Sequence, residues 1–149
     1  MTNRGPEPSC DLIRRMWTVF QRVLDEATPG LDERGLYPKA VFLLAALDRH
    51  PFPAELAAAL ALPPPTVSHM VRQMEALGYL EREVDSDDLR RFRLRLTRSG
   101  RAALDHGQGC VKGALQRHLG CLSTAESHEF SRLLRVLDES PVKSTESVQ

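Results

Sequence analysis

The run of three prolines at Pro63-Pro64-Pro65 restricts this chain more than any other stretch of its sequence. Proline fixes φ near a helical value but has no backbone N–H, so a helix accepts it best in the first turn, where those N–H groups have no intrahelical partner. A residue before proline is pushed towards extended backbone. Leu62, Pro63 and Pro64 are therefore expected to be extended, and Pro65 is expected to be the first residue of a helix.

Two short helices should meet at this corner. The helix after the prolines is expected to run to Gly78, a residue suited to a left-handed C-cap, and an alanine-rich helix from Pro53 to Leu60 precedes it. On the second helix the apolar positions are Val67, Met70, Val71 and Met74, and the polar ones are Thr66, Ser68, His69, Arg72 and Gln73. Two short helices joined by a tight turn predict a helix-turn-helix.

The chain before this motif predicts two more helices. Apolar residues recur at helical spacing from Leu12 to Ala27, and Pro29-Gly30 is expected to end that helix. A second run from about Pro38 is apolar nearly all round, which indicates a helix that is buried on most sides and stops near His50-Pro51.

Beyond Gly78 the apolar spacing changes from helical to alternating. Residues 79–84 and 91–96 both alternate and flank an acidic turn at 85–88, which is typical of a β-hairpin. In the second segment Phe92, Leu94 and Leu96 are expected on one face, and Arg91, Arg93 and Arg95 on the other.

Two helices are expected after the hairpin. Thr97 suits the N-cap of the first, whose apolar spacing extends from Leu104 to Leu119. Ser123-Thr-Ala-Glu126 predicts a capping box that opens a last helix, which the residues up to Pro141 should end. The elements together predict a mainly α fold with a small β-hairpin, of the α+β class.

Length and composition suit a single folding unit. We place it at residues 11–138, between a flexible N-terminus at 1–10 and a disordered tail at 139–149. Basic and acidic residues balance at 20 each, and no apolar run is long enough for a membrane span. Three widely spread cysteines argue for reduced thiols rather than a disulfide framework. We therefore expect a soluble, cytoplasmic protein that needs no cofactor.

The balanced charge hides one basic segment. Arginines stand at positions 90, 91, 93, 95, 98 and 101, and residues 90–101 contain no carboxylate. Dense cationic side chains dominate phosphate binding, and an arginine on a projecting loop suits a narrow minor groove. Alone, such a run is more often only a solvated strand face. Next to a helix-turn-helix it favours double-stranded DNA as the partner.

Several motifs resemble the MarR (multiple antibiotic resistance regulator) family of winged-helix transcription factors, over roughly residues 11–138. They are Leu77-Gly78-Tyr79-Leu80-Glu81-Arg82, Asp88-Leu89-Arg90, and Leu96-Thr97 followed by Gly100. The resemblance implies a DNA-binding part at about 36–97 and N- and C-terminal dimerisation helices at 11–28 and 98–138. It also implies that Asp88 pairs with and positions basic side chains, that Arg90 enters the minor groove, and that the protein is an obligate dimer. Many family members respond to a small molecule or an oxidant.

The prolines depart from the family pattern, which commonly has serine where this chain has Pro63. Their missing N–H groups cannot face a phosphate, so we expect phosphate contacts to move to Thr66, Ser68 and the wing arginines. For base reading we favour Ser68, His69, Arg72 and Gln73, with Arg72 suited to guanine and Gln73 to adenine; each could instead touch only the backbone. The whole expected DNA-binding set is Pro65, Thr66, Ser68, His69, Arg72, Gln73, Asp88, Arg90, Arg91 and Arg93.

The regulatory input is less visible in the sequence. Met16, Trp17, Tyr37 and Phe42 could line an apolar ligand cleft, or they could be plain core. Cys10 lies roughly where peroxide-sensing relatives keep a reactive cysteine, but its register is shifted and the tyrosine that accompanies it there is missing. His106 with Cys110, and His118 with Cys121, are possible half-sites for zinc, but nothing completes a ligand set, so packed or solvated pairs are favoured and no metal is expected.

These observations predict a homodimeric winged helix-turn-helix repressor, responsive to a ligand or an oxidant, that binds a pseudo-palindromic operator specifically. The alternative is a winged-helix module that uses the same face to bind protein without specific DNA reading. An enzyme finds little support, because the sequence has no nucleophile elbow, glycine-rich phosphate loop or paired catalytic carboxylates.

Overall fold

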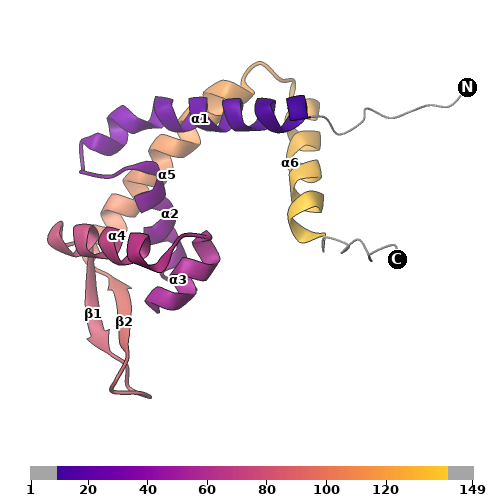
Figure 1. Ribbon diagram of the computed structural model, residues 1–149. Helices are drawn as coiled ribbons and strands as arrows, with labels where there is room; N and C mark the ends of the chain where they lie inside the picture. Colours follow the sequence, from indigo (N-terminus) through magenta and orange to yellow (C-terminus); the bar gives the residue numbers. More distant parts are fainter. Residues whose placement is uncertain (1–9, 141–149) are drawn as a thin grey trace, which may run out of the picture. The chain divides into compact units, whose positions relative to one another are not determined.

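The computed structural model describes residues 10–140, which form six helices and one two-stranded antiparallel sheet (Figure 1). In chain order the elements are α1 (Cys10–Asp32), α2 (Pro38–Ala46), α3 (Pro53–Leu60), α4 (Pro64–Ala76), β1 (Leu80–Val84), β2 (Phe92–Leu96), α5 (Arg98–Leu119) and α6 (Thr124–Glu139). The expected mainly α fold with a β-hairpin is confirmed. Most of the expected flexible N-terminus (1–10) and disordered tail (139–149) lies outside the described residues.

The chain divides into two compact units, one up to Leu115 and one from Gln116 onwards. The first unit holds the hydrophobic core, which the second half of α1 builds together with α2, α3, α4, the root of the hairpin and the first part of α5. The largest fully buried side chains are Leu31, Leu36, Leu43, Leu44, Leu56, Met74, Val67 and Val71. No helix among residues 10–140 is both long and apolar enough to cross a membrane.

Helix α1 continues through Pro29 and ends at Asp32, so the expected end at Pro29-Gly30 is wrong. Leu31 is fully buried, and its packing offsets part of what Pro29 costs the helix. The actual stop is Gly35, at φ +64°. The Gly35 N–H donates to the Asp32 carbonyl and the next N–H to the Leu31 carbonyl, each at 3.0 Å, which is the Schellman pattern that glycine allows.

Helix α2 ends at Ala46, a few residues before the expected end near His50-Pro51. Turns follow it, and the His50 N–H still donates to the Ala46 carbonyl at 2.9 Å. The expected burial of this helix on most sides is confirmed. Its buried residues are Ala40, Val41, Leu43 and Leu44.

Helix α4 begins at Pro64, so the expected start at Pro65 is wrong by one residue. Pro63 is the N-cap, with φ −58° and ψ 139°. Its carbonyl accepts the N–H groups of Thr66 at 3.0 Å and Val67 at 3.2 Å, and these bonds draw Pro64 into the helix although another proline follows it. At the other end, Gly78 has φ +74° and confirms the expected left-handed cap.

The hairpin confirms the alternation but not all of the expected burial. Leu80 pairs with Leu96, and Val84 with Phe92. On the expected apolar face Leu94 is buried, whereas Phe92 is 51% exposed. The Leu94 N–H donates to the Pro51 carbonyl at 2.7 Å, which attaches the hairpin to the loop between α2 and α3.

The end of α4, the start of β1 and the start of α5 meet in one place, which we call the Gly78–Gly100 junction. Thr97 caps α5 as expected, because its hydroxyl accepts the Gly100 N–H at 3.0 Å. The Thr97 and Ser99 hydroxyls both donate to the Gly78 carbonyl, and the Thr97 N–H donates to the Tyr79 carbonyl at 3.1 Å. A Cβ on Gly100 would lie 1.7 Å from that Tyr79 oxygen, so only glycine fits there.

The second unit contains the end of α5 and helix α6. Ser123 and Glu126 form the expected capping box at the start of α6, with both reciprocal hydrogen bonds present. None of the residues of α6 is buried. Its exposed apolar side chains are Phe130, Leu133, Leu134, Val136 and Leu137.

Replacing Gly100 by alanine should lower the free energy of unfolding by about 1–3 kcal/mol, because the new Cβ forces the Gly78–Gly100 junction apart. The matched control is Gly109→Ala on the same helix, where a Cβ meets nothing within 4 Å. That change should stabilise α5 by up to about 1 kcal/mol. Denaturant unfolding measures both variants, and equal effects would show that the junction is not tightly packed.

Candidate nucleic-acid interface

Helix α4 has the two-sided character that its sequence predicts. Val67, Met70, Val71 and Met74 are buried in the core. On the other side Thr66 and Ser68 are half-buried, and His69, Arg72 and Gln73 are exposed. The expected base-reading side chains therefore lie on one accessible face of a helix that is held firmly from behind.

The N-terminus of α4 offers no free backbone donor. Pro63, Pro64 and Pro65 have no N–H. The next two N–H groups, those of Thr66 and Val67, both donate to the Pro63 carbonyl. A helix N-terminus usually attracts phosphate through its unpaired N–H groups, so at this end of α4 an anion can be bound only by side chains.

Gln73 has a partner that the sequence does not suggest. The Tyr37 hydroxyl donates to Gln73 Oε1 at 2.8 Å. Burial raises the pKa of Tyr37 above its ordinary value, which keeps the hydroxyl protonated as a donor. One lone pair of Oε1 is thus engaged, and the NH₂ group is the part of the Gln73 amide that has no partner within residues 10–140.

Two arginines of the hairpin are neutralised by carboxylates. Arg95 forms ion pairs with Glu81 at 2.5 Å and Glu83 at 2.8 Å across the hairpin. Arg82 binds both carboxylate oxygens of Glu75 on α4, at 2.7 and 3.0 Å.

Three wing arginines lack such a partner. The guanidinium of Arg90 makes no hydrogen bond or ion pair within residues 10–140, and its side chain is exposed at the tip. Arg91 and Arg93 lie over the ring of Phe52, with the guanidinium carbons 3.8 and 5.9 Å from the ring centre. The unpaired positive charge of the wing is therefore concentrated on these three side chains.

Asp88 acts differently from the role implied by the resemblance. Its carboxylate accepts the backbone N–H of Arg90 at 3.0 Å rather than a guanidinium. An aspartate that bonds the N–H two residues later closes a local turn. Asp88 thus shapes the backbone that carries Arg90, and within residues 10–140 its carboxylate makes no ion pair with a basic side chain.

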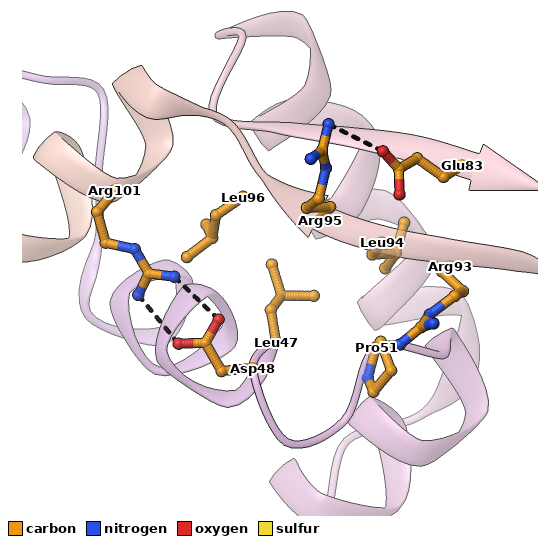
Figure 2. A pocket seen from close by; sticks show the side chains of 9 residues that line it. All are labelled: Leu47, Asp48, Pro51, Glu83, Arg93, Leu94, Arg95, Leu96 and Arg101. Atoms are coloured by element: carbon orange, nitrogen blue, oxygen red, sulfur yellow. Dashed lines mark hydrogen bonds and ion pairs between the residues drawn. The ribbon is translucent and has the colours of Figure 1, made fainter.

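A cavity of about 320 Å³ lies at the root of the wing (Figure 2). Its lining residues are Leu47, Asp48, Pro51, Glu83, Arg93, Leu94, Arg95, Leu96 and Arg101. Arg101 reaches from α5 to both carboxylate oxygens of Asp48, each at 3.0 Å, and Arg95 is bonded to Glu83. These ion pairs brace the wing root, and Arg93 is the lining arginine that they do not neutralise.

Comparisons with known proteins agree with this geometry. The model of the MarR family matches residues 34–91. The HTH-type transcriptional repressor MdtR of Bacillus subtilis is 25% identical over 118 residues, which cover 78% of this chain and 76% of that protein. Residues 34–91 of the chain thus match the MarR family. Proteins of this family are transcriptional regulators and not enzymes.

Two solved structures show the same fold. A Mycobacterium tuberculosis MarR family protein in complex with p-aminosalicylic acid has a TM-score of 0.72 and 25% identity, covering 86% of this chain and 98% of its own. A MarR family regulator from Rhodococcus has a TM-score of 0.76 and 19% identity, covering 92% of this chain and 100% of its own. The second likeness shows the fold alone.

The expected ligand-binding residues stay a prediction. Met16 and Trp17 are 54% and 61% exposed on the first half of α1. Tyr37 precedes α2 and is held by Gln73, and Phe42 is 39% exposed. None of the four lines the cavity at the wing root.

The cysteines and histidines are placed as packed or exposed groups. His106 Nε2 lies 2.7 Å from the Gly30 carbonyl, and the Cys110 sulfur lies 3.6 Å from the same nitrogen. A Cβ on Gly30 would lie 2.8 Å from that sulfur, so the pair packs α5 against the end of α1. Cys10 and Cys121 are exposed. Among residues 10–140 no three ligand side chains cluster as a metal site would need.

Two contributors to the interface were missed by sequence reasoning. Phe52 stands alone between Pro51 and Pro53, and nothing in that pattern indicates that arginines lie over it. The carboxylates of Glu81 and Glu83 did carry a signal, because they alternate on a strand that faces an arginine-rich strand, as cross-strand ion pairs require.

Asp48 should titrate below its ordinary pKa in the folded protein, because its hydrogen bonds with Arg101 favour the charged form. The stability from a lowered pKa is present above the unfolded value and lost as the pH falls through the folded value. Since both groups are largely exposed, solvent screening keeps the stability at stake small. Carboxyl NMR titration should show the Asp48 pKa rising in Arg101→Gln. It should not move in Arg98→Gln, one helical turn earlier.

Proposed function

We propose that this MarR family protein is a repressor that binds a pseudo-palindromic duplex operator as a homodimer. The observation that carries the proposal is the exposed polar face of α4 beside a wing with unpaired arginines, both joined at the Gly78–Gly100 junction. A helix held in this way fits the major groove, and a wing beside it reaches the flanking minor groove.

Helix α4 would read bases through side chains only. Arg72 is exposed and makes no bond within residues 10–140, so it is free to bind guanine O6 and N7. Gln73 would differ from the adenine reader expected from its sequence. With its Oε1 on Tyr37, it presents NH₂ donors, which suit acceptors such as guanine O6 or thymine O4. Ser68 and His69 complete the base-reading set.

The wing and the start of α4 would bind the DNA backbone. Arg90 projects from the tip and fits the minor groove, where negative potential is greatest when the groove is narrow. Arg91 and Arg93 would meet phosphates, together with the hydroxyls of Thr66 and Ser68. Pro65, next to them and exposed, would make apolar contact with the sugar-phosphate backbone.

The terminal helices would form the homodimer. Exposed apolar patches that are larger than a few hundred Å² mark protein contacts. The first half of α1 exposes Leu12, Ile13, Met16, Trp17, Val19 and Phe20, and α6 exposes a second apolar set. Burying both against a second copy would place two recognition helices on half-sites about one helical turn apart.

The regulatory signal would be a small molecule acting in the cytoplasm. The Mycobacterium tuberculosis family member bound to p-aminosalicylic acid supports an aromatic carboxylate as one class of effector. Met16, Trp17, Tyr37 and Phe42 are the residues we propose for this contact, and an effector that displaced Tyr37 would release Gln73. Oxidation of the exposed Cys10 is the alternative signal. Either signal must favour one separation of the two recognition helices to change DNA affinity.

Selection of bound duplexes from a random pool tests the proposal directly. The purified protein should recover an inverted repeat, and its affinity for that duplex should fall steeply as salt concentration rises. Recovery of no motif, together with binding that is insensitive to salt, would replace the DNA-binding regulator by a winged-helix protein-interaction module.

Replacing Arg90 by alanine should weaken binding to nearly all duplexes and lower the slope of log affinity against log salt by about 1, because one phosphate-neutralising cation is lost. Arg95→Ala removes the same charge from the same hairpin, but that guanidinium is already paired with carboxylates. Its slope should stay that of the unaltered protein. Fluorescence anisotropy over a salt series measures both, and an unchanged slope for Arg90→Ala would remove the wing tip from the interface.

Replacing Leu137 by glutamate should raise the dimer dissociation constant at least about tenfold, because an unpaired carboxylate would be buried between the two copies. Leu137 is 70% exposed on α6. Arg135→Glu puts the same side chain on that helix outside the apolar set and should leave the dimer intact. Sedimentation equilibrium distinguishes the two, and a dimer equally strong in Leu137→Glu would show that α6 does not form the interface.

A further inference from the structure

Phe52 lies where the wing meets the helix-turn-helix. It is the half-buried N-cap residue of α3. Its ring carries the guanidinium of Arg91 at 3.8 Å and that of Arg93 at 5.9 Å. The neighbouring carbonyl of Pro51 accepts the Leu94 N–H, so the backbone also holds the ring beside β2, which contains Arg93 and directly follows Arg91.

The ion pairs of the hairpin leave Arg91 and Arg93, and not Arg95, to contact the ring of Phe52. Glu83 lies directly opposite Arg93 in the strand register, yet its carboxylate bonds Arg95. Arg93 and Arg91 therefore keep their charge, and the face of an aromatic ring is the partner left to them. A ring attracts a guanidinium by its quadrupole without neutralising it, so both side chains remain available to an anion.

We propose that Phe52 is a positioning residue for DNA binding. Its ring holds Arg91 and Arg93 extended beside the wing in the free protein, ready for two phosphates. An exposed arginine loses rotamer freedom when it binds, and a side chain that is already ordered loses less. This inference rests on the proposed DNA-binding function, and it adds a residue that itself meets no phosphate.

The test compares Phe52→Leu, which stays apolar but has no ring, with Phe52→Trp, which keeps an aromatic face. The probe is a fluorescein-labelled duplex of random sequence, titrated over a salt series. Phe52→Leu should weaken affinity about two- to fivefold with an unchanged salt slope, because the same cations still meet phosphates. Phe52→Trp should bind as tightly as the unaltered protein or more tightly.

The decisive comparison repeats the Phe52→Leu change in the double variant Arg91→Ala/Arg93→Ala, which lacks both arginines. This double variant should itself lower the salt slope by about 2, and adding Phe52→Leu to it should change affinity no further. An equal loss in both backgrounds would overturn the inference, since Phe52 would then act through the fold and not through these arginines. So would a loss in Phe52→Trp as large as in Phe52→Leu.

A measurement without DNA separates this inference from the proposed function. In the free protein the side-chain protons of Arg91 should be shifted upfield in the NMR spectrum by the ring current of Phe52, and Phe52→Leu should abolish that shift. If the unaltered protein binds the duplex and Phe52→Leu binds equally well, only the positioning role fails. If the unaltered protein shows no salt-dependent binding, the DNA-binding function fails and the positioning role with it.

Discussion

The close approach of Gly100 to the Tyr79 carbonyl is the constraint on which the geometry of the interface depends. It brings the last turn of α4, the first residue pair of the hairpin and the first turn of α5 within hydrogen-bonding distance of one another. The angle of the wing to the recognition helix is thus set by backbone groups and two hydroxyls. The ion pair between Glu75 on α4 and Arg82 on β1 is a second connection between these two elements. The motifs shared with MarR proteins around Gly78 and Thr97 are the residues of this junction.

The arginines in and beside the wing have two kinds of partner, carboxylates and an aromatic ring. Glu81, Glu83 and Asp48 neutralise those nearest the root, where charge would otherwise repel charge, and the ring of Phe52 carries two others without neutralising them. Positive potential is left at the tip and on one side. A protein with no net charge can in this way present a small surface that attracts an anion.

The fold could be predicted from local patterns, and the errors fall where tertiary contacts decided the outcome. Amphipathic spacing gave α4 its correct faces, and alternation gave the hairpin. Pro29 looked like a helix end because the burial of Leu31 and the cap at Gly35 depend on packing that local spacing does not contain. Likewise, the polar residues of α4 could be named from the sequence, but the bond from Tyr37 to Gln73 joins positions 36 apart and changes which group Gln73 offers.

The three prolines at the head of α4 also affect how this regulator can diverge. A phosphate held by backbone N–H groups is held whatever side chain stands there, so substitution barely alters such a contact. Here each donor near the start of the helix belongs to a side chain, because the prolines have no N–H and the next two N–H groups are bonded to Pro63. In the proposed complex with DNA, each of these contacts would therefore be gained or lost by a single codon change. The prolines thus make the start of the helix rigid, while the side chains beside them leave the contacts of the proposed interface open to evolution.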